Sequence, residues 1–205
     1  MMLSLVLSLT VLLAAEGAAP PSTIEKGVLD HIVLEVSALP AKPPLVVRRF
    51  PAQEANTGTA ERGDNEKRTE AVKMLKNEAP RLLAESILKS LGTGAFASVT
   101  ESEEPAVEGA LVLEGRFTEI DPGSRAKRYW GGFGAGKSGV GVEGTLKDAT
   151  GRILATFSHR RHSGIGIGGG DYVKFLSDDT RDVGHDIAVF LARWSAGGDL
   201  RKSAK

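Results

Sequence analysis

The feature that most constrains the fold is a regular alternation of apolar and polar residues on both sides of a short turn, within residues 139–159. The segment "GVGVEGTLKD" (139–148) places four small or apolar residues on one face: Val140, Val142, Gly144 and Leu146. After "ATG" (149–151), the segment "RILATFSH" (152–159) does the same with three: Ile153, Ala155 and Phe157. Because side chains alternate between the two faces of a β-strand, the pattern predicts an antiparallel hairpin with one face on a core.

Three other segments are predicted strands. "ALVLEGRFTEI" (110–120) alternates in its second half, so four of its residues are expected to share a face: Leu113, Gly115, Phe117 and Glu119. It ends in the turn "DPGS" (121–124), which has proline at the favoured second position. "LVVRRF" (45–50) and "AFASVTE" (95–101) are shorter strands, and "HIVLEV" (31–36) is a candidate for one more.

Two segments carry the period of an α-helix. Residues 66–91 place an apolar side chain every three or four positions: Val72, Leu75, Ala79, Leu82, Leu83, Ile87 and Leu91. Residues 172–194 repeat the pattern: Val173, Leu176, Val183, Ile187, Phe190, Leu191 and Trp194. This spacing predicts one buried stripe on each helix. Pro80 lies inside the first helix and predicts either a kink or two abutting helices.

The resulting order of elements is β–α–β–β–β–β–α. It predicts an α/β protein of α+β-like organisation, a single, mostly antiparallel sheet with two main helices packed on one face. We expect this domain to span residues 45–195. A proline-rich N-terminal segment, residues 20–44, precedes it, and a flexible basic tail, residues 196–205, follows it.

Residues 1–19 are predicted to be a signal peptide. The apolar run "LSLVLSLTVLLAA" (3–15) has 13 residues, whereas a membrane-spanning helix needs about 20. Small residues follow and place cleavage near residues 17–19, after Gly17 or Ala19. No Lys or Arg precedes the run, which leaves a wrongly assigned start, an uncleaved anchor and a buried helix as alternatives. We therefore expect an exported protein, periplasmic or envelope-associated.

The glycine-rich stretch "RYWGGFGAGKSGVGVEG" (128–144) contains a match to the phosphate-loop pattern G-x-x-x-x-G-K-[ST] at residues 131–138. A phosphate loop follows a buried strand and opens a helix, but here the upstream flank is charged and the downstream flank has period two. The match is therefore interpreted as strand geometry, in which glycine admits a close backbone or aromatic ring. The alternative is a nucleotide-binding enzyme that uses Lys137 and Ser138.

The segment "LVLEGRFTEIDPGSRAKRYWGGFGAGKSGVGVEGTLKDATGRILATFSH" (111–159) resembles the bacterial family known as domain of unknown function 4410. With the upstream strand and helix, the resemblance covers roughly residues 45 to 195. It implies an exported protein without an established activity, arranged like the small α/β domains of envelope assembly lipoproteins such as those of curli secretion. The family assigns no catalytic residues. The chain departs from its many lipoprotein members because it has no cysteine to lipidate.

Composition argues against nucleic-acid binding, and histidine spacing argues against a metal or hydrolase site. Lys plus Arg and Asp plus Glu both number 26, so no basic field favours nucleic acid. His159, His162 and His185 could form a metal or hydrolase site, but residues three apart on a strand point to opposite faces. We interpret these histidines as solvated, and the arginines of "HRRH" (159–162) as a rim paired with three acidic residues: Asp178, Asp179 and Asp182.

These observations predict an exported, non-enzymatic envelope protein that binds another envelope protein or itself. No cofactor, metal, nucleic acid or small-molecule ligand is predicted, and a position near the membrane is compatible with the sequence. The candidate contact residues come from two glycine-rich stretches: Tyr129, Trp130, Gly132, Phe133, Gly134, Ile165 and Ile167.

Overall fold

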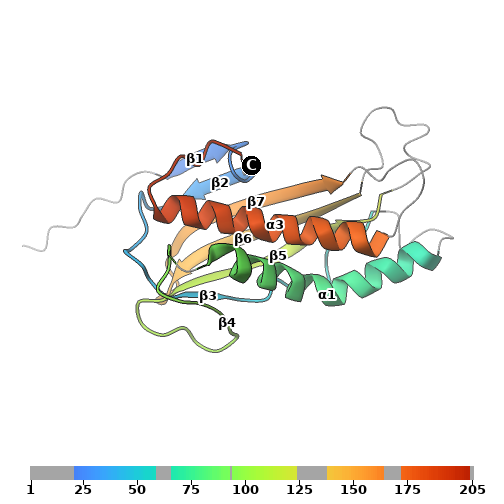
Figure 1. The fold of residues 1–205 in the computed structure, drawn as a ribbon, viewed down its shortest axis with the longest axis horizontal. Coiled ribbons are helices and arrows are strands. Elements are labelled where there is room, and N and C mark those ends of the chain that lie inside the picture. Colours follow the sequence, from blue (N-terminus) through green and yellow to red (C-terminus); the bar gives the residue numbers. More distant parts are fainter. Residues whose placement is uncertain (1–20, 59–65, 93, 124–137, 164–171, 204–205) are drawn as a thin grey trace, which may run out of the picture.

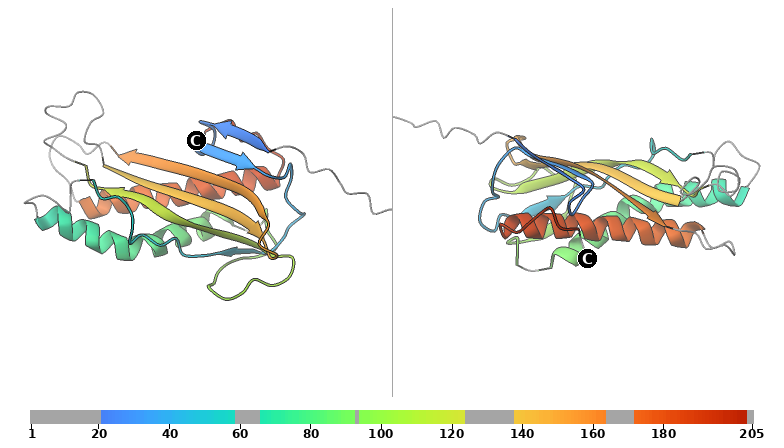
Figure 2. Two further views of the ribbon diagram at one scale, coloured as in Figure 1. Left: turned by 180° about the vertical axis from the view of Figure 1, so that it is seen from behind. Right: turned by 90° about the horizontal axis from the view of Figure 1, so that it is seen from above.

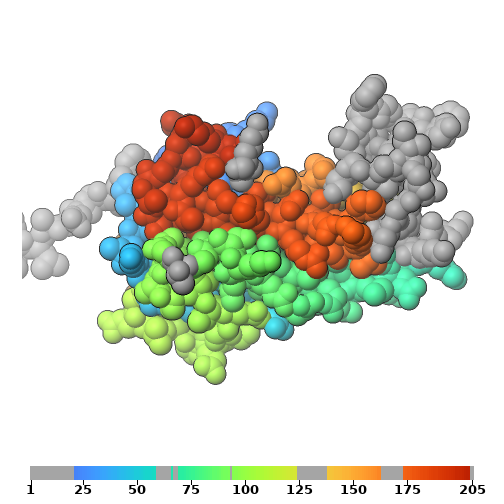
Figure 3. Space-filling view, in the orientation of Figure 1, coloured from blue at the N-terminus to red at the C-terminus, as the bar shows by residue number. Residues whose placement is uncertain are grey.

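The computed structural model describes residues 21–58, 66–92, 94–123, 138–163 and 172–203. These residues form two layers, a twisted sheet and a pair of helices that both lie on one of its faces (Figures 1 and 2). Figure 3 shows the helices side by side over that face. The prediction of one sheet with two helices on one face is confirmed for this part of the chain.

The elements follow in chain order, with bounds close to the predicted ones. They are β1 (Ser22–Glu25), β2 (His31–Leu34), β3 (Leu45–Val47), α1 (Glu66–Leu91), β4 (Val99–Glu101), β5 (Leu111–Asp121), β6 (Ser138–Asp148), β7 (Ile153–Ser163) and α3 (Tyr172–Ser195). The predicted order is wrong at its start, because β1 and β2 precede β3 and join the same sheet. The candidate strand within residues 31–36 is confirmed as β2, whereas β1, which has only four residues, is not among the predicted strands.

The sheet is mixed, which corrects the prediction of a mostly antiparallel sheet. Its strand order is β1-β2-β7-β6-β5-β3-β4. Strand β3 runs parallel to both of its neighbours, β4 and β5, whereas the other neighbouring pairs are antiparallel. Helix α1 connects β3 to β4, and such a crossover is what a parallel pair requires.

The hairpin between β6 and β7 forms as predicted. The Asp148 carboxylate accepts hydrogen bonds from the Thr150 amide (2.9 Å), the Thr150 hydroxyl (2.6 Å) and the Arg152 amide (3.0 Å). The Thr150 hydroxyl first, and the two amides with it, lower the pKa of Asp148 against the opposing effect of desolvation. Gly151 completes the turn at φ +88°, a conformation that favours glycine.

Two irregularities in the strands overturn parts of the predicted faces. The register shifts between Phe117 and Glu119, so that Glu119 pairs with Gly141 instead of following Phe117 onto the helix side. A second shift lies beside Leu146 and leaves Ile153 exposed, apart from Ala155 and Phe157. A bulge reverses the alternation beyond it because the side-chain period of a strand is two residues.

Aromatic rings pack over two strand glycines. A Cβ on Gly144 would overlap the ring of Phe157, and a Cβ on Gly115 would overlap the ring of Phe50. Both rings are nearly fully buried. Glycine at these positions therefore makes room for the core that fills the space between sheet and helices.

Helix α1 is one continuous helix with Pro80 inside it, which excludes two abutting helices, and Figure 1 shows it bending near its middle. It meets α3 at Gly184, where a Cβ would lie 2.7 Å from Ser86 Cβ and 2.9 Å from Leu83 O. Glycine thus permits the close crossing of the two helices. Neither described helix combines the length and apolarity needed to cross a membrane.

Candidate functional site

The residues predicted to contact a partner lie outside the described residues: Tyr129, Trp130, Gly132, Phe133, Gly134, Ile165 and Ile167. The same holds for residues 131–137 of the phosphate-loop match. Ser138, the last residue of that match, is the first residue of strand β6. A phosphate loop leads into a helix whose first amides face the phosphates. The described flank of this match is a strand, in agreement with the predicted strand geometry.

Both predicted contact segments are bounded by described residues at one end of the sheet (Figure 2). Ser138 opens β6 directly after the first segment, and it is paired with Ser163, which closes β7 directly before the second. Asp121, at the end of β5, pairs with Gly139. The described residues that bound the two segments therefore lie at the same end of the sheet.

A cluster of charged side chains joins β7 to α3 on the covered face of the sheet. His159 Nε2 donates to Asp186 Oδ2 (2.8 Å), and Arg161 donates to both oxygens of the same carboxylate, from Nε (2.6 Å) and Nη2 (2.9 Å). Asp186 is 2% exposed and His159 is 9% exposed, so both of these groups are withdrawn from water, whereas the Arg161 side chain is partly exposed. A bidentate guanidinium–carboxylate pair is the strongest form of such a contact.

The electrostatics of the cluster keep Asp186 charged. Burial alone would raise the pKa of Asp186, but the hydrogen bonds from His159 and Arg161 and their charges outweigh burial and lower it. The pKa of Arg161 is raised, first by the hydrogen bond to Asp186 and against its own desolvation, with smaller contributions from Asp182 and Asp179. The pair is therefore ionised throughout the neutral range.

A third element reaches the cluster through Asp30, in the turn between β1 and β2. Asp30 Oδ2 lies 3.1 Å from His159 Nδ1 and accepts the backbone N–H of Arg160 at 2.7 Å. A cavity of about 380 Å³ borders Asp30, His159 and Asp186. Each ring nitrogen of His159 thus faces a carboxylate, and both oxygens of Asp186 are occupied. The cluster therefore links three parts of the fold: the turn between β1 and β2, strand β7 and helix α3.

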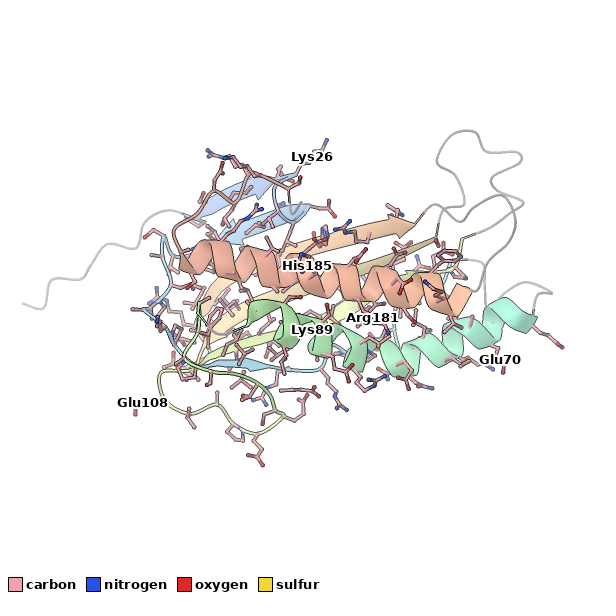
Figure 4. All side chains as sticks on the ribbon, in the orientation of Figure 1. Lys26, Glu70, Lys89, Glu108, Arg181 and His185 are labelled. Atoms are coloured by element: carbon pink, nitrogen blue, oxygen red, sulfur yellow. The ribbon has the colours of Figure 1, made fainter. Side chains whose placement is uncertain are left out.

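The other histidines do not join His159. His162 lies on the opposite face of β7, as predicted, and is exposed, with Nδ1 3.3 Å from Ser138 O. His185 contacts Ser90 Oγ (3.2 Å) on the outer side of the helices, near Lys89 and Arg181 (Figure 4). Across the ranges that the structure describes, no group of three His, Asp or Glu side chains is placed to hold a metal ion.

The predicted solvation of His159 is wrong, and the neighbouring arginines form their ion pairs with residues other than the predicted acidic ones, although Asp182 and Asp179 act on Arg161 through their charges. Arg161 pairs with Asp186, and Arg160 pairs with Glu119 across β6. A sequence signal for this cluster exists: His159 and Arg161 continue the alternation of Ala155 and Phe157 on the helix side. Asp186 falls within the buried stripe of α3, beside Ile187.

The uncovered face of the sheet is polar. Charged side chains pair across its strands, Arg116 with Glu143 at 2.6 Å and Lys147 with Glu114. Arg116, Glu143 and Glu114 border a groove of about 530 Å³ together with His31 and Ser158. Of the described residues, the large apolar side chains that are exposed are few: Met74, Val107 and Ile153. No extended apolar patch is present on this part of the molecule.

Residues 46–166 match the family described as "Domain of unknown function (DUF4410)". No curated protein matches the chain. Among solved structures, the "PelC dodecamer from Paraburkholderia phytofirmans" is 16% identical with a TM-score of 0.43, over 74% of this chain and 91% of that one. The "Crystal structure of uncharacterized protein" is 14% identical with a TM-score of 0.41, over 74% and 94% of the two chains. Likenesses this distant assign no activity.

Proposed function

This chain belongs to the family described as "Domain of unknown function (DUF4410)", and from that premise we propose that it is an exported, non-enzymatic protein of the bacterial envelope that associates with itself. Association with another envelope protein is the second form of the same function. The apolar run at residues 3–15 supports export.

One observation carries the proposed contact surface. The described residues that bound residues 124–137 and 164–171 meet at the same end of β5, β6 and β7, through the pair Ser138 and Ser163. Residues near the two predicted contact segments are therefore brought together although the segments are far apart in the sequence. The uncovered face of the sheet carries paired charges, and exposed ion pairs contribute little energy.

The chemistry of the His159 cluster supports a non-enzymatic role. A general base needs a ring nitrogen within reach of a substrate proton. In His159, Nε2 is bonded to Asp186, whereas Nδ1 lies 3.1 Å from the Asp30 carboxylate without forming a hydrogen bond to it and is buried, out of reach of a substrate. The same contacts explain the cluster as a structural link between three elements.

The proposed surface is tested by replacing Gly132 and Gly134 with Val and measuring mass in solution by light scattering. We expect association to be lost while the far-UV circular dichroism stays unchanged. Gly94→Ala is the matched control, because a Cβ there meets nothing within 4 Å. If the double variant associates as the wild type does, the contact surface lies elsewhere.

Export is tested by fractionating a Gram-negative host that expresses the full-length chain and by measuring the intact mass of the product. We expect a periplasmic or envelope-associated protein cut after Gly17 or Ala19. An uncut cytoplasmic product would contradict the proposal.

A further inference from the structure

The C-terminal strap, which we define as residues 196–203, packs against the hairpin of β1 and β2. We call its docking position there, at Gly27 and Val28, the hairpin seat. The strap leaves the end of α3 and turns back toward the hairpin (Figure 1). Leu200 O accepts the Val28 amide at 2.8 Å, and the Leu200 side chain is buried. Gly27 lies beneath that carbonyl, and a Cβ there would overlap it. The hairpin turn is therefore shaped to receive this backbone.

Two glycines form a hinge between α3 and the strap. Gly197 has φ +67°, and a Cβ on it would meet nothing within 4 Å. The Gly197 and Gly198 amides donate to Trp194 O (3.0 Å) and Arg193 O (2.7 Å), which closes the last turn of the helix. Because glycine reaches both signs of φ without a steric cost, the chain can leave this hinge in another direction.

The strap does not fill the groove in which it lies. A cavity of about 230 Å³ borders Leu34, Trp194 and Leu200, and the 380 Å³ cavity borders Asp30 and Ser203. The indole Nε1 of Trp194 is buried and has no hydrogen-bond partner among the described residues. Both hollows are open to solvent, and the strap is held by few hydrogen bonds, from the Val28 amide to Leu200 O and from the Arg193 guanidinium to Lys202 O and Ser203 O, so it can open locally more readily than the core.

We propose that strap exchange is a second contact in this self-association, beside the surface proposed above: the strap of one copy occupies the hairpin seat of a second copy. The inference rests on the proposed self-association and names a route for it. The occupant is the strap of another copy because the strap is the segment that the structure shows to fit this seat. Exchange preserves the Val28–Leu200 contact in trans and changes only the hinge, which is why swapping is a low-cost route to dimers.

The direct test uses the absence of native cysteine. Val28→Cys and Leu200→Cys are made as separate variants, mixed under conditions where the wild type associates, and oxidised. Strap exchange predicts a disulfide-linked heterodimer between positions 28 and 200, identified by mass spectrometry of the linked peptides. Leu200→Cys mixed with Met74→Cys is the control, since Met74 is 50% exposed on α1, and it should give no such product.

A second variant ends the chain after residue 198 and needs no cysteine. It should retain the far-UV circular dichroism of the wild type and lose at least tenfold in its association constant. If the wild type associates but this variant associates equally, or no 28–200 heterodimer forms, strap exchange is wrong while self-association stands. If the wild type is monomeric at every concentration tested, the proposed function itself fails.

Discussion

Asp186 balances the charges of the contact between α3 and β7. Its carboxylate holds both His159 and Arg161, so removing its charge leaves Arg161 without its partner on the covered face. We expect Asp186→Asn to lower the free energy of unfolding by about 2–3 kcal/mol. This is less than for a fully buried pair because Arg161 is 38% exposed. Urea unfolding at neutral pH measures the change.

Asp178→Asn is the matched control on the same helix. Asp178 is about half exposed and pairs with Lys174 and Arg181, contacts worth about 0.5 kcal/mol or less each. Equal losses in the Asp186 and Asp178 variants would show that the buried cluster contributes no more than a surface pair.

The lowered pKa of Asp186 predicts acid sensitivity. Burial opposes this shift, but the bonds to His159 and Arg161 prevail, so the folded pKa lies below the value of about 3.9 of an unfolded Asp. The stabilisation is complete above that value and is lost as the pH falls through the folded pKa. Between about pH 4 and pH 2, the unfolding free energy of the wild type should therefore fall more steeply than that of Asp186→Asn. Parallel pH profiles would contradict this assignment.

At the scale of elements, the sequence predicts what depends on local period and misses what depends on distant neighbours. The helices and the hairpin at Gly151 follow from side-chain spacing and turn residues, and their observed bounds are close to the predicted ones. The parallel pairing of β3 is set by strands far along the chain. The two register shifts are also absent from the pattern, because an apolar alternation does not show where an extra residue is inserted.

The cluster of His159, Arg161 and Asp186 also combines features that the local period predicts with a contact that it does not. His159 and Asp186 each follow the period of their own element and can be assigned to a buried face. Which strand lies beneath α3 is decided by sheet order, so their contact at 2.8 Å is not predictable from spacing alone. The predicted contact residues, Tyr129 and Ile165 among them, lie outside the described residues and stay a prediction.

The packing of β6 against β7 predicts that a methyl group added at Gly144 destabilises the fold. A Cβ on Gly144 would overlap the buried ring of Phe157, so Gly144→Ala should lower the unfolding free energy by about 1–3 kcal/mol. Phe157→Leu removes the ring, and the double variant should be more stable than the sum of the two losses predicts. Additive losses measured by urea unfolding would show that the ring and the glycine are independent.

The whole molecule is larger than the segment that identifies its family. The match covers residues 46–166, which excludes β1, β2 and α3. Yet β2 pairs with β7 and makes it an interior strand of the sheet, and α3 covers the same face as α1 (Figure 2). The matched segment alone would leave one edge of β7 unpaired and one side of the core exposed to water.

A truncation at each boundary tests where the cooperative unit begins. Removal of residues 1–34 deletes four buried aliphatic side chains: Val28, Leu29, Ile32 and Leu34. At about 1.5–3 kcal/mol each, their loss is comparable with the whole stability of an ordinary domain, about 5–15 kcal/mol. We expect this variant to lose cooperative urea unfolding and to aggregate through the freed edge of β7, whereas a variant lacking residues 1–19 should unfold as the wild type does. If the variant lacking residues 1–34 unfolds cooperatively at the urea midpoint of the wild type, the hairpin of β1 and β2 contributes nothing to the stability of the domain. The seat for the C-terminal strap would then be dispensable to the fold.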